Sequence, residues 1–176
     1  MNIEEKLKST IRDVADFPKP GILFKDITPL LEDPALCDEI THHLVLPFKN
    51  SDLHAIVGVE SRGFLFGMLM AQHLKIPFVP VRKAGKLPYK TISYAYDLEY
   101  GSATVEMHVN SLKPDWNVLV HDDLLATGGT ASAAAELIKM QNAQVAGFSF
   151  VVELEFLKGS QILAKHNTPV HSLIKY

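Results

Sequence analysis

The chain has 176 residues, of which 47% are hydrophobic and 21% charged, and its formal net charge is -3 at pH 7. This length suits one domain with a substantial core, and the composition excludes a disordered or fibrous protein. The acidic excess argues against a nucleic-acid partner, because contacts with phosphate backbones normally leave a basic excess. The longest apolar run, residues 63–71, is about half as long as a membrane span, so no membrane partner is expected.

The N-terminal part combines a short helix with a turn-rich stretch. Ile3, Leu7 and Ile11 have the spacing of one face of an amphipathic helix, and residues 17–21 contain two prolines and a glycine. We interpret this opening as a separate flap. An aspartate followed by a proline then predicts a helix over residues 33–47.

The composition of the first residues and the cysteine content indicate a cellular location. Charges alternate over the first 12 residues, where a signal peptide would be apolar. Cys37 is the single cysteine, so no intrachain disulfide can form. A cytoplasmic location is expected.

The middle of the chain alternates strand and helix patterns. Helical patterns cover residues 63–74 and 130–141, and they lie between short apolar segments typical of buried parallel strands. This alternation predicts an α/β fold, a single domain over residues 1–176 with a central twisted parallel sheet flanked by helices, Rossmann-like in its core. Residues 94–100 and 104–109 are expected to form a hairpin or meander outside this alternation. The predicted parallel strands are Ala55–Val59, Pro77–Val81, Asn117–His121 and Gln144–Val152.

A basic stretch follows the second predicted strand. Lys83, Lys86 and Lys90 lie among Gly and Pro residues, in a segment too polar for a core and too basic to be inert in an acidic chain. We interpret about residues 82–96 as a mobile lid hairpin that would close over a ligand and exclude water. A solvated hairpin tip is the alternative interpretation.

The most informative segment is an apolar strand that runs into two acids, a Gly/Thr turn and a helix. The turn, Ala126-Thr127-Gly128-Gly129-Thr130, lets backbone amides approach a phosphate at a helix N-terminus, and its two threonines add hydroxyl donors. No lysine follows the glycines and no G-x-G-x-x-G spacing is present, so neither a nucleoside triphosphate nor a dinucleotide is indicated. Asp122 and Asp123 precede the turn and are suitable acceptors for vicinal hydroxyls. The segment predicts a site for a sugar phosphate; an ordinary tight turn with solvated acids is the alternative.

Residues 122–130 resemble the phosphoribosyl-diphosphate motif of the type I phosphoribosyltransferases. Three further segments, residues 17–29, 60–64 and 82–88, are similar to the adenine branch of that family, and together with residues 98–101 they occur in the family's order. The resemblance implies purine salvage: transfer of the phosphoribosyl group of 5-phosphoribosyl 1-diphosphate to adenine, with release of pyrophosphate and AMP. It also implies a homodimer.

The resemblance assigns roles to individual residues. Mg2+ is the implied cofactor, carried in mainly by the substrate and its waters, and Asp122 or Asp123 could lie near it. A non-proline cis peptide is implied near Glu60-Ser61, and about residues 1–32 would form a hood over the base. The implied diphosphate-binding residues are Ser61, Arg62, Lys83 and Lys86; the ribose 5-phosphate residues are Asp122, Asp123, Ala126, Thr127, Gly128, Gly129 and Thr130; the adenine-binding residues are Leu23, Phe24 and Lys25; and the catalytic residues are Glu99, Arg62 and Lys83.

Glu99 is expected to protonate or hydrogen-bond N7 of adenine, which eases loss of the N9 proton. This role needs a partly desolvated carboxyl. Single residues also have alternative interpretations without a catalytic or binding role. Glu99 could be a surface charge, Arg62 a surface ion-pair partner and Phe24 an ordinary core residue. His121, Ala131 and Lys25 depart from the usual family residues. Two other functions stay open at this point, transfer to another purine base and a non-catalytic regulator that binds phosphoribosyl diphosphate.

Overall fold

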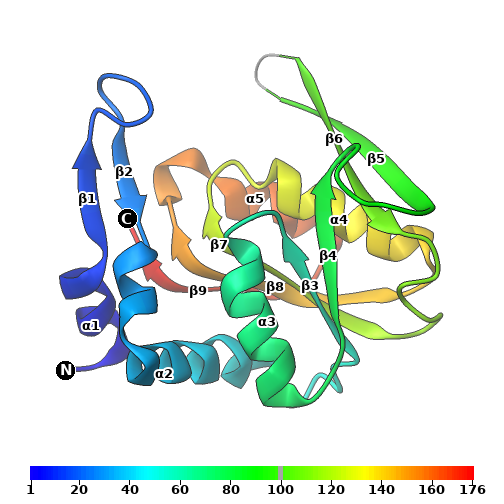
Figure 1. Ribbon diagram of the computed structural model, residues 1–176, viewed down its shortest axis with the longest axis horizontal. Coiled ribbons are helices and arrows are strands. Elements are labelled where there is room, and N and C mark those ends of the chain that lie inside the picture. The colour runs from blue at the N-terminus through cyan, green and yellow to red at the C-terminus, as the bar shows by residue number, and fades with distance from the viewer. Residues whose placement is uncertain (99–100) are drawn as a thin grey trace.

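The computed structural model describes residues 1–98 and 101–176. Its centre is a seven-stranded mixed sheet in the order β5-β6-β4-β3-β7-β8-β9 (Figure 1). β3, β4, β7, β8 and β9 are mutually parallel, whereas β6 pairs antiparallel with both β4 and β5. The strands are β3 (Ala55–Val59), β4 (Phe78–Lys83), β5 (Thr91–Asp97), β6 (Ser102–His108), β7 (Asn117–Leu125), β8 (Gln144–Glu153) and β9 (Val170–Lys175).

Helices cover both faces of this sheet, as predicted. α3 begins and ends at the predicted residues, and α4 begins one residue earlier than expected. The order of strands and helices confirms the predicted α/β class in a single domain. The helices are α1 (Ile3–Thr10), α2 (Pro34–Val45), α3 (Gly63–Leu74), α4 (Gly129–Met140) and α5 (Gly159–Leu163), with short 3-10 turns η1 (Thr28–Glu32), η2 (Leu46–Phe48), η3 (Glu155–Leu157) and η4 (Ala164–His166).

The sheet differs from the prediction in three respects. The expected hairpin is present as β5 and β6, but it extends the main sheet as an antiparallel edge, so the sheet is not wholly parallel. β7 continues four residues beyond the predicted end at His121, because Leu124 and Leu125 keep their pairing with Val152 and Glu153 of β8. β9 was not predicted, since its sequence Val-His-Ser-Leu-Ile-Lys has neither a continuous apolar run nor a strict alternation of polar and apolar residues.

Two apolar clusters form the core, one on each face of the sheet. Along β7, Val118 and Val120 belong to the cluster that contains the buried alanines of α4, whereas Leu119 belongs to the cluster of α2 and α3. This alternation follows from the two-residue period of a strand. His121 comes two residues after Leu119, so it lies on the same face of the sheet as Leu119, and it is fully buried.

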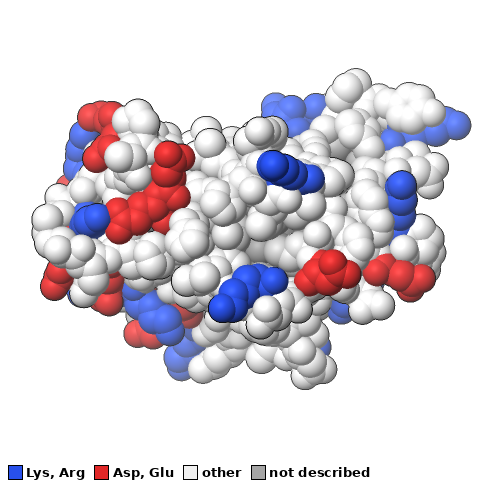
Figure 2. Space-filling view, turned by 90° about the horizontal axis from the view of Figure 1, so that it is seen from below, with Lys and Arg blue, Asp and Glu red and all other residues white. Residues whose placement is uncertain are grey.

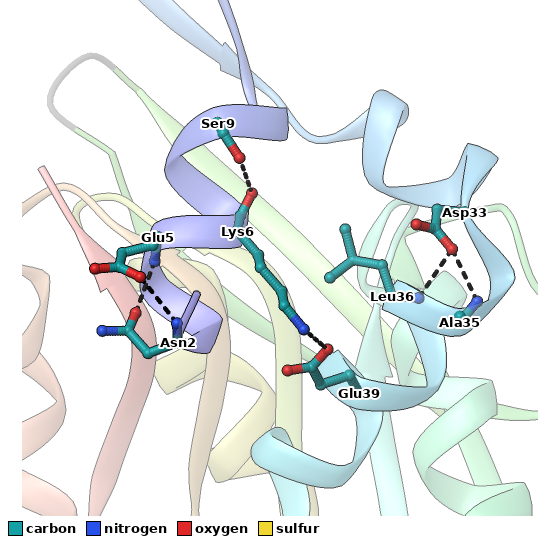
Figure 3. A network of polar contacts seen from close by, with 8 residues as sticks. All are labelled: Asn2, Glu5, Lys6, Ser9, Asp33, Ala35, Leu36 and Glu39. Carbon is teal, nitrogen blue, oxygen red and sulfur yellow. Dashed lines mark hydrogen bonds and ion pairs between the residues drawn. The ribbon is translucent and has the colours of Figure 1, made fainter.

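The N-terminal part is packed onto the domain rather than detached from it. Leu7, Ile27 and Leu30 are completely buried in the cluster of α2 and α3. Asp33 caps α2 as predicted, and its carboxylate accepts from two backbone N–H groups of the first turn (Figure 3). An ion pair between Lys6 and Glu39 joins α1 to α2.

A separate two-stranded sheet, β1 (Arg12–Ala15) with β2 (Leu23–Asp26), follows α1 and stands at one side of the molecule (Figure 1). The turn-rich residues 17–21 join these two strands. In the described part of the chain, no helix is both long and apolar enough to cross a membrane.

Candidate active site

The predicted site residues converge at the carboxyl ends of three neighbouring parallel strands. Residues 60–62 follow β3, Lys83 ends β4, and Asp122 and Asp123 lie in the last part of β7. Ligands of open α/β sheets bind at this edge. A cavity of about 450 Å3 opens there, and it is lined by Glu60, Ser61, Arg62, Lys83, Asp122, Asp123 and Leu124.

The Gly/Thr turn forms a second, narrower cavity beside the first. It has a volume of about 70 Å3, its walls include all five residues 126–130, and Asp122 is common to both cavities. Gly128 has a φ of +84°, a conformation that disfavours any side chain, and α4 begins at the next residue. The turn therefore presents backbone N–H groups at a helix N-terminus, the arrangement that binds a phosphate.

Gly128 also meets a neighbouring segment at close range. A Cβ added at Gly128 would lie 2.6 Å from the carbonyl oxygen of Gly159, and a Cβ added at Gly159 would lie 2.3 Å from the carbonyl oxygen of Ala126. Gly159, at the start of α5, thus supports the turn from behind. Sequence reasoning missed this residue, because nothing in a glycine 31 positions after Gly128 signals the contact.

The two acids of β7 are held close together in a partly desolvated setting. Asp122 Oδ1 accepts from the backbone N–H of Asp123 at 2.8 Å, and Arg62 Nε lies 2.8 Å from Asp123 Oδ2. Burial, reinforced by the charge of Asp123, raises the pKa of Asp122 well above its usual range. Burial also raises the pKa of Asp123, against the opposing effect of the Arg62 guanidinium. The acids are poised for a partner that supplies positive charge or hydroxyl donors.

Asp122→Asn is expected to stabilise the fold and to impair binding of a sugar phosphate. A carboxyl whose pKa is raised in the folded state costs stability once the unfolded chain ionises, so the gain should be absent at pH 4 and grow as the pH rises toward 8. Asparagine keeps the Oδ1 acceptor but loses the charge, so affinity for ribose 5-phosphate should fall about 10- to 100-fold. Thermal unfolding at several pH values and calorimetric titration measure both effects; a destabilised variant with normal affinity would contradict them.

Arg62 connects the acids to the N-terminal sheet. Its guanidinium carbon lies 5.1 Å from the centre of the Phe24 ring, on the same side chain whose Nε faces Asp123. The expected cis peptide is present between Glu60 and Ser61, directly before Arg62. Phe24 in turn packs edge to face on Phe17 with 5.1 Å between ring centres. The structure thus places the predicted stacking ring, the predicted diphosphate ligand and a predicted ribose ligand in one row.

The other two predicted adenine-binding residues flank Phe24 on β2. Leu23 is half exposed. The Lys25 side chain is buried; its Nζ donates to Asp13 Oδ1 at 2.6 Å and lies 3.9 Å from the centre of the Tyr176 ring. These contacts hold the Lys25 ammonium within the N-terminal sheet, away from the role of a free cation at the base.

The basic stretch after β4 is anchored by two carboxylates that sequence reasoning did not single out for this task. Glu60 accepts from the Lys83 backbone N–H at 2.9 Å and from Arg82 Nε at 3.1 Å. Buried Glu106 of β6 accepts from the backbone N–H groups of Lys86 and Leu87 at 3.1 and 2.9 Å. These hydrogen bonds lower the pKa of Glu106, so it stays ionised.

Lys83 and Lys86 therefore have different settings. Lys83 lines the large cavity, whereas Lys86 is exposed on the turn that Glu106 holds. Glu99, which was predicted to act on N7 of adenine, lies outside the described residues, between the described ends of β5 and β6. Within residues 1–98 and 101–176, no three His, Cys, Asp or Glu side chains are grouped to hold a metal ion.

Comparison with known proteins agrees with this geometry. Residues 29–173 match the phosphoribosyl transferase domain family. An adenine phosphoribosyltransferase of Nitrosococcus oceani is 54% identical over 98% of this chain and 99% of its own length. The crystal structure of adenine phosphoribosyltransferase from Rhodothermus marinus is 47% identical, covers 99% of this chain and 98% of that one, and has a TM-score of 0.93. The enzyme from Saccharomyces cerevisiae, crystallised with adenine and an imino-altritol bisphosphate, is 41% identical over 97% of this chain and 98% of its own, with a TM-score of 0.88.

The Gly/Thr turn, the two acids before it and Arg62 all lie within the residues that match, and the chain belongs to the phosphoribosyltransferase family, in its type I fold. Within the family it belongs with the adenine phosphoribosyltransferases.

Proposed function

We propose that this chain transfers the phosphoribosyl group of 5-phosphoribosyl 1-diphosphate to adenine in purine salvage, with release of pyrophosphate and AMP. One observation carries the proposal: the narrow cavity of the Gly/Thr turn and the large cavity of Arg62 and Lys83 share Asp122. A 5′-phosphate in the first would place the ribose at the acids and the diphosphate in the second. That order matches the order of groups along the substrate.

The paired acids would hold the sugar. The 2′ and 3′ hydroxyls of the ribose donate to carboxylates, and such charge-assisted hydrogen bonds are stronger than neutral ones. As the bond to the diphosphate breaks, positive charge develops on the ribose, much as in glycoside cleavage. Burial disfavours the ionised form of Asp122 and Asp123, and positive charge on the ribose would favour it, so the interaction would strengthen as the reaction proceeds.

The cations of the large cavity would hold the leaving group. Arg62 has a forked guanidinium suited to a diphosphate, and Lys83 lies across the same cavity. Arg62 is paired with Asp123 in the structure. We propose that the diphosphate takes over part of this guanidinium, which leaves Asp123 free for a ribose hydroxyl.

Mg2+ fits this donor set. Asp123 Oδ2 is buried without an aligned hydrogen bond from the described residues, although Arg62 Nε is 2.8 Å away, and carboxylate oxygens are the ligands this ion prefers. Asp122 and Asp123 are the residues that would hold it, directly or through water. When bound with the substrate, the ion would neutralise diphosphate charge.

Adenine would lie between the N-terminal sheet and the ribose. Phe24 offers a ring face next to Arg62, and the backbone of Leu23 and Lys25 would read the edge of the base. A site that accepts from the 6-amino group disfavours a 6-oxo purine, because it leaves a polar group unpaired. Glu99 is proposed to act at N7, residues 1–32 as the hood and residues 82–96 as the lid.

A homodimer and a cytoplasmic location belong to the same proposal. Leu65, Met68 and Leu69 form an exposed apolar stripe on α3, opposite the face that enters the core, and exposed apolar patches mark interaction surfaces. Seen from below, the middle of the molecule is mostly uncharged, and charged side chains gather mainly toward its left side (Figure 2). The location rests on the lone thiol of Cys37.

The direct test is a base panel. The purified chain is incubated with 5-phosphoribosyl 1-diphosphate, Mg2+ and either adenine, hypoxanthine or guanine, and nucleotides are separated by chromatography. We expect AMP, with a kcat/KM for adenine at least about 100-fold above that for either 6-oxo purine. Faster formation of IMP or GMP would overturn the base assignment. Ligand-stabilised melting without any nucleotide formed would support a non-catalytic regulator instead.

A further inference from the structure

A tyrosine of the β5–β6 hairpin reaches the phosphate-binding turn. Tyr96 Oη lies 2.8 Å from Oγ1 of Thr130, the last residue of that turn. The Tyr96 ring also packs on Gly129, where an added Cβ would lie 3.3 Å from two ring carbons. The hairpin runs beside α4, so this contact joins the edge of the sheet to the start of the helix (Figure 1).

We propose that Tyr96 is a positioning residue that orients the Thr130 hydroxyl toward the 5′-phosphate of the substrate. The inference rests on the proposed phosphate site. A phosphate accepts hydrogen bonds, so Thr130 must donate its single hydroxyl proton to it. The oxygen of Thr130 then accepts from Tyr96, and the two hydroxyls form a chain that ends on the phosphate. Such chains strengthen each member by polarisation.

The surroundings of Tyr96 fit this role. Tyr96 and Thr130 line a cavity of about 120 Å3, together with Glu60, Lys83 and Asp122. The ring is partly buried against the core. Tyr96 therefore stands where the phosphate-binding turn, the lysine-bearing strand β4 and the hairpin meet. Movement of the β5–β6 hairpin would withdraw the Tyr96 hydroxyl from Thr130. The position of the hairpin would thereby affect the affinity for the phosphate.

Tyr94 provides a matched control. It lies two residues earlier on β5, on the same face of the strand, and is likewise partly buried against the core. Its hydroxyl makes no hydrogen bond to any residue that the structure describes. Tyr94→Phe and Tyr96→Phe thus remove the same atom from equivalent backbone positions, and only the second removes the link to Thr130.

The experiment compares these two variants with the wild type. For Tyr96→Phe we expect the KM for 5-phosphoribosyl 1-diphosphate and the dissociation constant of ribose 5-phosphate to rise about 3- to 10-fold. We expect kcat and the KM for adenine to change less than twofold in Tyr96→Phe, and Tyr94→Phe to keep the wild-type dissociation constant of ribose 5-phosphate. In a Thr130→Val background, Tyr96→Phe should have no further effect on ribose 5-phosphate binding.

Two results would overturn the inference. One is normal ribose 5-phosphate affinity in Tyr96→Phe, and the other is an equal loss in Tyr94→Phe, which would indicate strand packing alone. Calorimetric titration with ribose 5-phosphate requires no turnover. The two proposals can therefore be tested separately. The proposed role of Tyr96 can be wrong although the wild type forms AMP, and it can be correct although the wild type forms none.

Discussion

Gly128→Ala is expected to lower the kcat/KM for 5-phosphoribosyl 1-diphosphate by at least about 100-fold and to destabilise the fold by about 2–5 kcal/mol. A side chain at φ +84° costs about 1–2 kcal/mol, and a Cβ 2.6 Å from the Gly159 carbonyl adds about 1–3 kcal/mol of overpacking. Relief of that overlap must move the turn, which misplaces the amides that face the phosphate. Steady-state kinetics and chemical denaturation measure the two effects.

Gly21→Ala is a control that separates the cost of a side chain at positive φ from the cost of steric overlap with Gly159. Gly21 has a φ of +85°, nearly that of Gly128, but an added Cβ there meets nothing within 4 Å. This control should lose only about 1–2 kcal/mol of stability. If both variants lost the same stability and Gly128→Ala kept normal kinetics, the close packing of Gly159 against the turn would have no functional importance.

His121→Leu is expected to remove a large part of the acid sensitivity of the fold. Neither ring nitrogen of His121 has a hydrogen-bond partner among the described residues, and burial lowers its pKa from 6.5 to about 3. The unfolded chain therefore takes up a proton that the folded chain refuses, so stability is full above pH 6.5 and declines as the pH falls toward 3. The whole decline corresponds to about 5 kcal/mol, and about 2 kcal/mol of it occurs by pH 5.

Denaturant unfolding at pH 7.5, 6 and 5 measures this effect. The wild type should lose about 2 kcal/mol more than His121→Leu between the first and last of these values. Leucine has a similar volume and suits the apolar surroundings on the side of Leu119. His73→Leu, which removes an exposed histidine of α3, should keep the wild-type slope. Equal slopes for all three proteins would show that His121 is not the source of the acid sensitivity.

Local patterns were sufficient to predict the elements that carry the site. Residues 55–59 and 63–74 form the predicted strand and helix without a shift, because a continuous apolar strand and a Gly-initiated apolar helix leave little choice. The turn at residues 126–130 was predictable because two adjacent glycines between a predicted strand and a predicted helix indicate a tight turn. The cis peptide at Glu60-Ser61 was reached only through the family resemblance.

Long-range contacts were not predictable from the sequence. The approach of Gly159 to Gly128, the hydrogen bond between Tyr96 and Thr130 and the anchoring of the basic stretch by Glu106 each join residues distant in the sequence. No local period or spacing encodes such contacts. The antiparallel edge has the same origin, since the hairpin was predicted but its pairing with β4 depends on the whole sheet.

A crystal structure with bound ribose 5-phosphate tests the central claim most directly. We predict that the phosphate contacts the backbone N–H groups of residues 127–130 and the Thr130 hydroxyl, while the 2′ and 3′ hydroxyls contact Asp122 and Asp123. A sugar phosphate bound elsewhere, with the turn left empty and the acids still directed at Arg62, would contradict the account.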